Sequence, residues 1–150
     1  MAAPIEALVA PHVIEYTYTR STGPILGAFL AGLRDQTILG IRTADGRVMV
    51  PPAEYDPVTS EGLSELVGVA DTGVVTTWAW NATPLEGQPL AEPFAWALVK
   101  LDGADTAMLA AVDAGSASAM STGMRVRARW ADERVGSIRD LVCFEPEAGV

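Results

Sequence analysis

The sequence offers few side chains for nucleophilic or acid–base chemistry. His12 is its single histidine and Cys143 its single cysteine. His12 lies near the N-terminus with no serine or cysteine nucleophile paired to it, and a general base works only with its partners in hydrogen-bond reach. Cys143 lies in an apolar segment, whereas an activated thiol needs an exposed and electropositive setting. We therefore expect neither residue to be catalytic.

Three arginines have the spacing of a binding stripe. Arg125, Arg127 and Arg129 alternate in the sequence, so a strand would present them on one face. The stripe is either a solvated strand face, which also discourages edge pairing, or a contact for an acidic partner or for phosphate groups. The spacing alone leaves both interpretations open.

Three tryptophans, Trp78, Trp80 and Trp96, form a second set. Aromatic side chains on a small β-barrel can stack on the bases of single-stranded nucleic acid. They can equally fill the barrel, cover its outer surface or line a protein interface. The net charge of −9 argues against a surface built to hold phosphates, so we favour a packing role.

The composition predicts one folded domain, with or without a small appended module. Hydrophobic residues make up 49% of the 150 residues and charged residues 19%, which allows a sizeable core. A single cysteine cannot form an internal disulfide, which fits a reducing cytoplasm. No apolar run is long enough to span a bilayer, so we expect no membrane partner.

The N-terminal part predicts an extended arm followed by a helix. Residues 15–20 alternate and are β-prone. Ser21 or Thr22 can cap a helix, Pro24 suits its first turn and Arg34 suits its C-terminal end. The apolar face of this helix is large for a small body, which indicates an interface. The residues expected to contact a partner are Tyr16, Tyr18, Arg20, Phe29 and Leu30.

The remaining chain predicts β-structure. Residues 38–42 and 47–50 predict a hairpin around Asp45-Gly46, and Pro51-Pro52 ends its ladder. From Leu66 the apolar period changes to two. The expected strands are 74–80 (with Val74, Thr76, Trp78 and Trp80 on one face), 94–101, 106–112, 124–130 and 138–144. Five strands with a loop or short helix between the third and the fourth match the OB-fold, a small Greek-key barrel.

These elements give a mainly β fold in three parts. The parts are an N-terminal arm of residues 1–23, a helix and hairpin module of residues 24–65, and a barrel with its tail, residues 66–150. The change of period near Leu66 predicts that the barrel folds by itself, with the smaller module docked on it or on a partner.

In this order the elements resemble the zinc-ribbon/OB-fold family of acyl-CoA-associated proteins. The resemblance extends over most of the chain, from Pro24 to Pro146. The segments that carry it are Ile38 to Gly40, Gly46 to Pro52, Tyr55 to Pro57, Val74 to Trp78, Phe94 to Leu101, Thr122 to Val126 and Phe144 to Pro146. The resemblance implies that the hairpin module is a zinc ribbon in its backbone.

The cysteines of such a ribbon are missing here. The family usually carries two CxxC knuckles. The places near the first knuckle hold Thr43 and Asp45, and those of the second hold Asp56 and Thr59. Structural zinc is held by four thiolate or imidazole ligands, which these residues do not supply. The resemblance therefore implies a degenerate, metal-free ribbon held by packing, and no cofactor.

Members of this family are typically encoded with, or fused to, enzymes that act on acyl-CoA thioesters. A member without the cysteines looks most like the domain that accompanies thiolase-like aldolases of steroid side-chain degradation. The resemblance implies a cytoplasmic, non-catalytic subunit that binds and stabilises or activates a thiolase-like enzyme in a hetero-oligomer. The chain would encounter acyl-CoA indirectly, when the partner binds it. Arg125, Arg127 and Arg129 are the candidates for contact with the CoA phosphates. Two alternatives stay open: a single-stranded nucleic-acid-binding OB-fold protein, and an independent acyl-CoA-processing enzyme.

Overall fold

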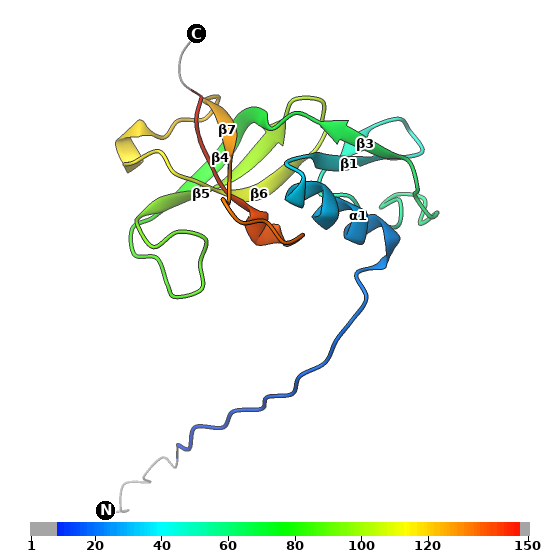
Figure 1. Ribbon diagram of the computed structural model, residues 1–150. Helices are drawn as coiled ribbons and strands as arrows, with labels where there is room; N and C mark the ends of the chain where they lie inside the picture. Colours follow the sequence, from blue (N-terminus) through cyan, green and yellow to red (C-terminus); the bar gives the residue numbers. More distant parts are fainter. Residues whose placement is uncertain (1–8, 148–150) are drawn as a thin grey trace, which may run out of the picture.

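The computed structural model describes residues 9–147, and its largest part is a closed barrel of five strands (Figure 1). The strands are β4 (Thr72–Asn81), β5 (Phe94–Leu101), β6 (Ala107–Val112), β7 (Arg125–Trp130) and β8 (Leu141–Pro146). Their order around the barrel is β4-β5-β6-β8-β7; β6 and β8 pair in parallel and the other neighbours antiparallel. Two 3₁₀ turns, η1 (Ala117–Ala119) and η2 (Ile138–Asp140), precede β7 and β8. The predicted five-stranded barrel is confirmed.

A β-bulge in β4 decides which of its side chains face the core. The register with β5 shifts directly after Val75, so Thr76 is an extra residue in the strand. Val75 is buried, and beyond the bulge Trp78 and Trp80 pack against the core. The expectation that Val74 and Thr76 share one face with Trp78 and Trp80 is therefore wrong, because simple alternation takes no account of an inserted residue.

A helix and a small sheet lie beside the barrel (Figure 1). They are α1 (Gly23–Arg34) and the strands β1 (Ile38–Arg42), β2 (Val48–Met49) and β3 (Leu66–Val69), in the sheet order β2-β1-β3. The predicted helix and hairpin are confirmed. The chain from Leu66 was assigned to the barrel, but β3 pairs with β1. The alternation of a short strand does not say which sheet it joins.

The sequence of α1 explains how it packs. Pro24 occupies its first turn, and Ile25, Phe29 and Leu33 follow at helical spacing and are buried. A Cβ atom at Gly32 would lie 2.8 Å from a backbone oxygen of the chain that leads into β1. Glycine at this place therefore lets the chain fold back closely after the helix.

The helix, the small sheet and the barrel share one core. Phe29 and Leu33 of α1 and Val50 after β2 belong to the same hydrophobic cluster as Val99 and Phe144 of the barrel. A barrel without α1 would therefore expose part of its own core to water. This packing opposes the expectation that residues 66–150 fold independently.

Polar contacts also fasten the smaller module to the barrel. The carboxylate of Asp105 accepts the N–H of Val48 at 2.8 Å, and the Thr106 hydroxyl oxygen accepts the N–H of Val50 at 2.9 Å. Both acceptors come from the turn between β5 and β6. In addition, Arg134 of the β7–β8 loop donates to the carbonyl of Arg34 at the end of α1, at 2.9 Å. The two modules are thus held as one body.

The described part of the N-terminal arm runs away from this body (Figure 1). Residues 9–22 are exposed and form no helix or strand. In the described chain, no helix is both long enough and apolar enough to cross a membrane.

Candidate functional site

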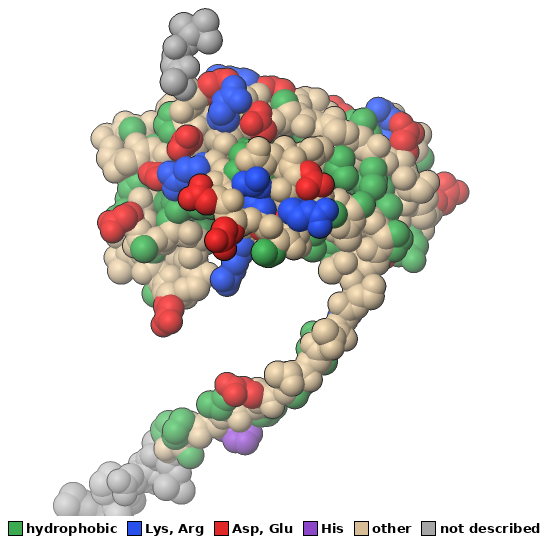
Figure 2. Space-filling model, in the orientation of Figure 1, with side chains coloured by type: hydrophobic (Ala, Val, Ile, Leu, Met, Phe, Trp, Pro, Cys, Tyr) green, Lys and Arg blue, Asp and Glu red, His purple; other side chains and the backbone are tan. Residues whose placement is uncertain are grey.

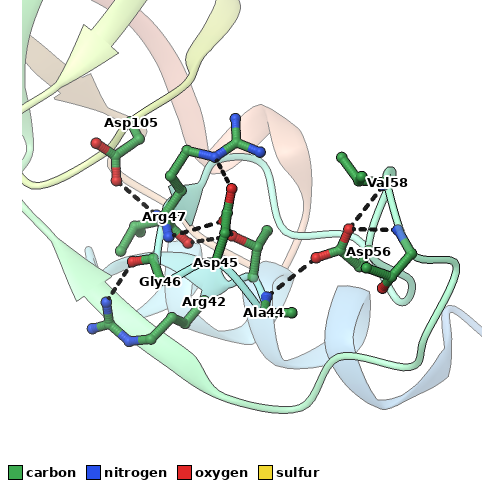
Figure 3. A network of polar contacts seen from close by, with 11 residues as sticks. Arg42, Ala44, Asp45, Gly46, Arg47, Asp56, Val58 and Asp105 are labelled. Carbon is green, nitrogen blue, oxygen red and sulfur yellow. Dashed lines mark hydrogen bonds and ion pairs between the residues drawn. The ribbon is translucent and has the colours of Figure 1, made fainter.

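Asp56 lies where the two turns of the ribbon-like module meet (Figure 3). Its Oδ2 accepts the N–H of Ala44, in the β1–β2 turn, at 3.2 Å. Its Oδ1 accepts the N–H groups of Val58 and Thr59, in the next turn, at 2.8 and 3.1 Å. An aspartate before a proline favours such a turn, because its carboxylate can bond the backbone two and three residues on. The contact with Ala44, in contrast, had no signal in the sequence.

These contacts also set the charge of Asp56. The N–H groups of Val58, Thr59 and Ala44 hold the pKa of its carboxyl below the ordinary value, although burial acts in the opposite direction. Asp56 is therefore ionised at neutral pH and joins the two turns as a charged acceptor.

Thr43 and Asp45 form a second set of contacts in the β1–β2 turn. The Thr43 hydroxyl lies 2.5 Å from Oδ1 of Asp45 and 3.0 Å from the carbonyl oxygen of Arg47. The Arg47 Nε donates to Oδ2 of Asp45 at 2.7 Å. The hydrogen bond from Thr43, followed by that from Arg47, lowers the pKa of Asp45 to about 2. The turn therefore satisfies its own polar groups.

The four residues at the implied ligand places lie in the two turns that meet here. Their polar groups are used in hydrogen bonds within these turns rather than left free to bind a metal ion. Thr43, Asp45 and Asp56 form these bonds through side chains, and Thr59 gives its N–H to Asp56. Across residues 9–147, no group of three or more His, Cys, Asp or Glu is placed to hold a metal ion. Asp56 ties the two turns together, which is the structural task of the metal in a ribbon with thiolates.

The residues expected to contact a partner fall into two groups. Tyr16, Tyr18 and Arg20 lie on the exposed arm, with 6.1 Å between the centroids of the two stacked tyrosine rings. Phe29, in contrast, is only 2% exposed and packs in the shared core, and Leu30 is half-buried against that core. The expectation of a surface role for Phe29 is thereby corrected, because the apolar face of α1 packs on the barrel of its own chain.

The arginine stripe on β7 is neutralised within the molecule. Each guanidinium pairs with two carboxylates: Arg125 with Asp102 and Glu147, Arg127 with Asp71 and Glu147, and Arg129 with Asp113 and Glu145. Two bonds of 2.7 and 2.6 Å join Arg125 to Asp102 and lower the pKa of that carboxyl to about 2. Figure 2 shows the same interspersion of basic and acidic side chains over the face in view. A phosphate would have to displace these carboxylates, so the pairing favours the charged strand face over contact with CoA.

The tryptophans do not share a face. Trp78 and Trp80 pack against the barrel core, whereas Trp96 packs edge-on against Phe94 in a separate cluster, with 5.0 Å between ring centroids. Cys143 belongs to this second cluster, where burial raises the pKa of its thiol to about 11. The three rings therefore form no common stacking platform, and the thiol stays protonated at neutral pH.

Much of the barrel matches a known protein family. Residues 66–131 match the family described as the ChsH2 C-terminal OB-fold domain. The barrel of this chain is similar to that family over these residues. The match runs from β3 to β7, so the last strand of the ChsH2-type barrel, β8, lies beyond it. No curated protein matches the sequence.

Two solved structures share the fold of this chain. One is a DUF35-family protein of unknown function from Sulfolobus solfataricus, 22% identical, with a TM-score of 0.56 over 71% of this chain and 78% of that one. The other is the Ltp2-ChsH2(DUF35) aldolase, 19% identical, with a TM-score of 0.60 over 85% of this chain and 98% of that one. The second match covers more of the chain than the barrel contains, so the ribbon-like module takes part in the shared fold.

An apolar cavity of about 420 Å³ lies on the ChsH2-type barrel between the β4–β5 loop and η2. Trp96, Leu109 and Val142 contribute to its lining, and its titratable residues are Arg139 and the protonated Cys143. His12 is exposed on the arm. Within residues 9–147, the cavity, the arm and the arginine stripe therefore do not assemble a nucleophile with a general base.

Proposed function

We propose that this chain is a non-catalytic accessory subunit that binds and orders a thiolase-like aldolase acting on acyl-CoA thioesters in steroid side-chain degradation. The observation that carries the proposal is the ChsH2-type barrel, since a ChsH2(DUF35) protein of the same fold is part of the Ltp2-ChsH2 aldolase. The lack of an assembled catalytic set among the described residues supports a role beside an enzyme rather than as one.

The physical effect on the partner would be a shift in its conformational population. A subunit that binds one state preferentially stabilises that state, and at a free concentration of 100 Kd the gain is about 2.7 kcal/mol. The net charge of −9 would steer the chain toward a basic surface of the partner. Tyr16, Tyr18 and Arg20 on the exposed arm are the residues we assign to the contact.

The two alternatives have less support. A single-stranded nucleic-acid site needs aromatic rings on one face and unpaired cations, whereas the tryptophans are divided between two clusters and the β7 arginines are paired. An independent acyl-CoA-processing enzyme needs a convergent set of titratable groups. We therefore retain the accessory role as the proposed function.

Reconstitution with the Ltp2-type subunit of the source organism tests the proposal. Retro-aldol cleavage of a steroid side-chain acyl-CoA and the melting temperature of the enzyme are measured with and without this chain. We expect a specific complex, a higher melting temperature of the enzyme subunit and faster turnover. An unrelated acidic protein at equal concentration is the control for unspecific protection. Equal rates and equal stability, or turnover by this chain alone, would refute the accessory role.

A further inference from the structure

The described part of the arm, residues 9–22, is exposed along its whole length. From residue 9 to residue 20, the described chain shows no hydrogen bond between the arm and the body. The backbone donors and acceptors of the arm therefore face water, and the segment runs away from the body in Figure 1. Backbone groups in this state are a template for pairing with another strand.

The side chains of the arm have the pattern of a sheet strand. Residues 14–19 alternate between Ile14, Tyr16, Tyr18 and a polar set of glutamate and threonines. β-Branched and aromatic residues are the types enriched in strands. Ile14, Tyr16 and Tyr18 are 74%, 78% and 76% exposed, and the stacking of the two tyrosine rings confirms that they share a face. The segment therefore has the side-chain pattern of a strand, although it pairs with no sheet in the described chain.

The body of the same molecule offers the arm little to pair with. The barrel is closed, and a closed barrel has no free edge. At one edge of the small sheet, β2 is already bonded by Asp105 and Thr106. The outer edge of β3 remains, and the arm of a second copy of the chain is the alternative strand for that edge.

We propose that Ile14–Thr19 adds as an edge strand to an exposed sheet of the partner enzyme. The main chain would supply the affinity, and Ile14, Tyr16 and Tyr18 would occupy an apolar surface next to that edge. The inference rests on the proposed function, and it specifies the partner chemistry: an unpaired β-edge flanked by apolar pockets at alternate positions. Six residues are a usual length for such a strand.

Strand addition predicts an effect with a period of two. N–H groups of successive residues point to opposite sides of a strand, so only every second one bonds the partner. Proline and alanine variants are made at each position from Glu15 to Thr19, and Kd for the Ltp2-type subunit is measured by titration calorimetry. The ratio of Kd for proline to Kd for alanine should be about three- to tenfold at alternate positions and near one between them.

The side chains give a matched control. Tyr16→Ala and Tyr18→Ala should raise Kd about tenfold or more, whereas Thr17→Ala and Thr19→Ala should change it less than about twofold. Because residues 9–20 are exposed and make no hydrogen bond to the body, all these variants should keep the melting temperature of the parent chain, which verifies folding.

A variant without residues 2–20 separates this inference from the proposed function. Loss of binding by this variant, with the alternating proline pattern, supports strand addition. Binding of equal strength without the arm, or proline effects without alternation, would overturn it and leave the accessory role intact. If the full chain forms no complex with the enzyme subunit, both strand addition and the accessory role are refuted. Self-association of the full chain that disappears without the arm would assign the strand to a second copy and overturn the assignment to the enzyme.

Discussion

Phe29 provides the sharpest test of how the molecule is built. The sequence places it on an apolar helix face that suits a partner, whereas the structure buries it in the core shared by α1 and the barrel. Phe29→Ala removes a ring that is 2% exposed. Leu26→Ala on the same helix removes a side chain that is 40% exposed, and it is the matched control.

The expected magnitude follows from burial. Truncation of a fully buried phenylalanine costs about 3–5 kcal/mol, because the lost transfer free energy adds to that of the cavity left behind. For a chain of this size, each kcal/mol lowers the melting temperature by about 2–4 °C, so we expect a loss of roughly 6–20 °C. Leu26→Ala should cost less than about 1 kcal/mol, since the side chain already contacts water.

Urea unfolding followed by tryptophan fluorescence and by far-UV circular dichroism measures both variants. We expect one coincident transition with both probes, because a shared core unfolds as a unit. Equal losses for Phe29→Ala and Leu26→Ala would show that α1 does not belong to the core. An early transition of the helix, with the barrel midpoint unchanged, would restore the independent barrel that the sequence predicts.

The remaining predictions concern the ribbon-like module. Because the folded pKa of Asp56 lies below its ordinary value of 3.8, its carboxylate stabilises the fold above that pH and loses this effect as the pH falls through the folded pKa. Asp56→Asn should therefore lower the melting temperature at pH 7, and the difference should narrow below pH 3.8; a constant difference would contradict the charged link. Thr106→Val removes the acceptor of the Val50 N–H and should cost about 1–3 kcal/mol in urea unfolding, whereas Thr19→Val on the arm should cost nothing measurable. Elemental analysis should find no stoichiometric zinc, and chelators should leave the melting temperature unchanged; one bound zinc per chain would contradict the polar link between the turns.

Local features of the fold are determined by the sequence. Asp45-Gly46 specifies the β1–β2 turn, Pro24 and the spacing of Ile25, Phe29 and Leu33 specify α1, and alternation specifies most barrel strands. These features depend on backbone conformations and periods within one segment, so the residues of that segment suffice to predict them. The lack of cysteines in the ribbon is a property of the sequence for the same reason.

Contacts between distant segments were decided only by the tertiary structure. The bulge at Thr76 arises from the register of β4 with β5, and β3 joins β1 rather than the barrel. The bond from Ala44 to Asp56 depends on how two turns meet, which no single segment encodes. The burial of Phe29 follows likewise from docking, since an apolar helix face can pack equally well on its own barrel or on another protein.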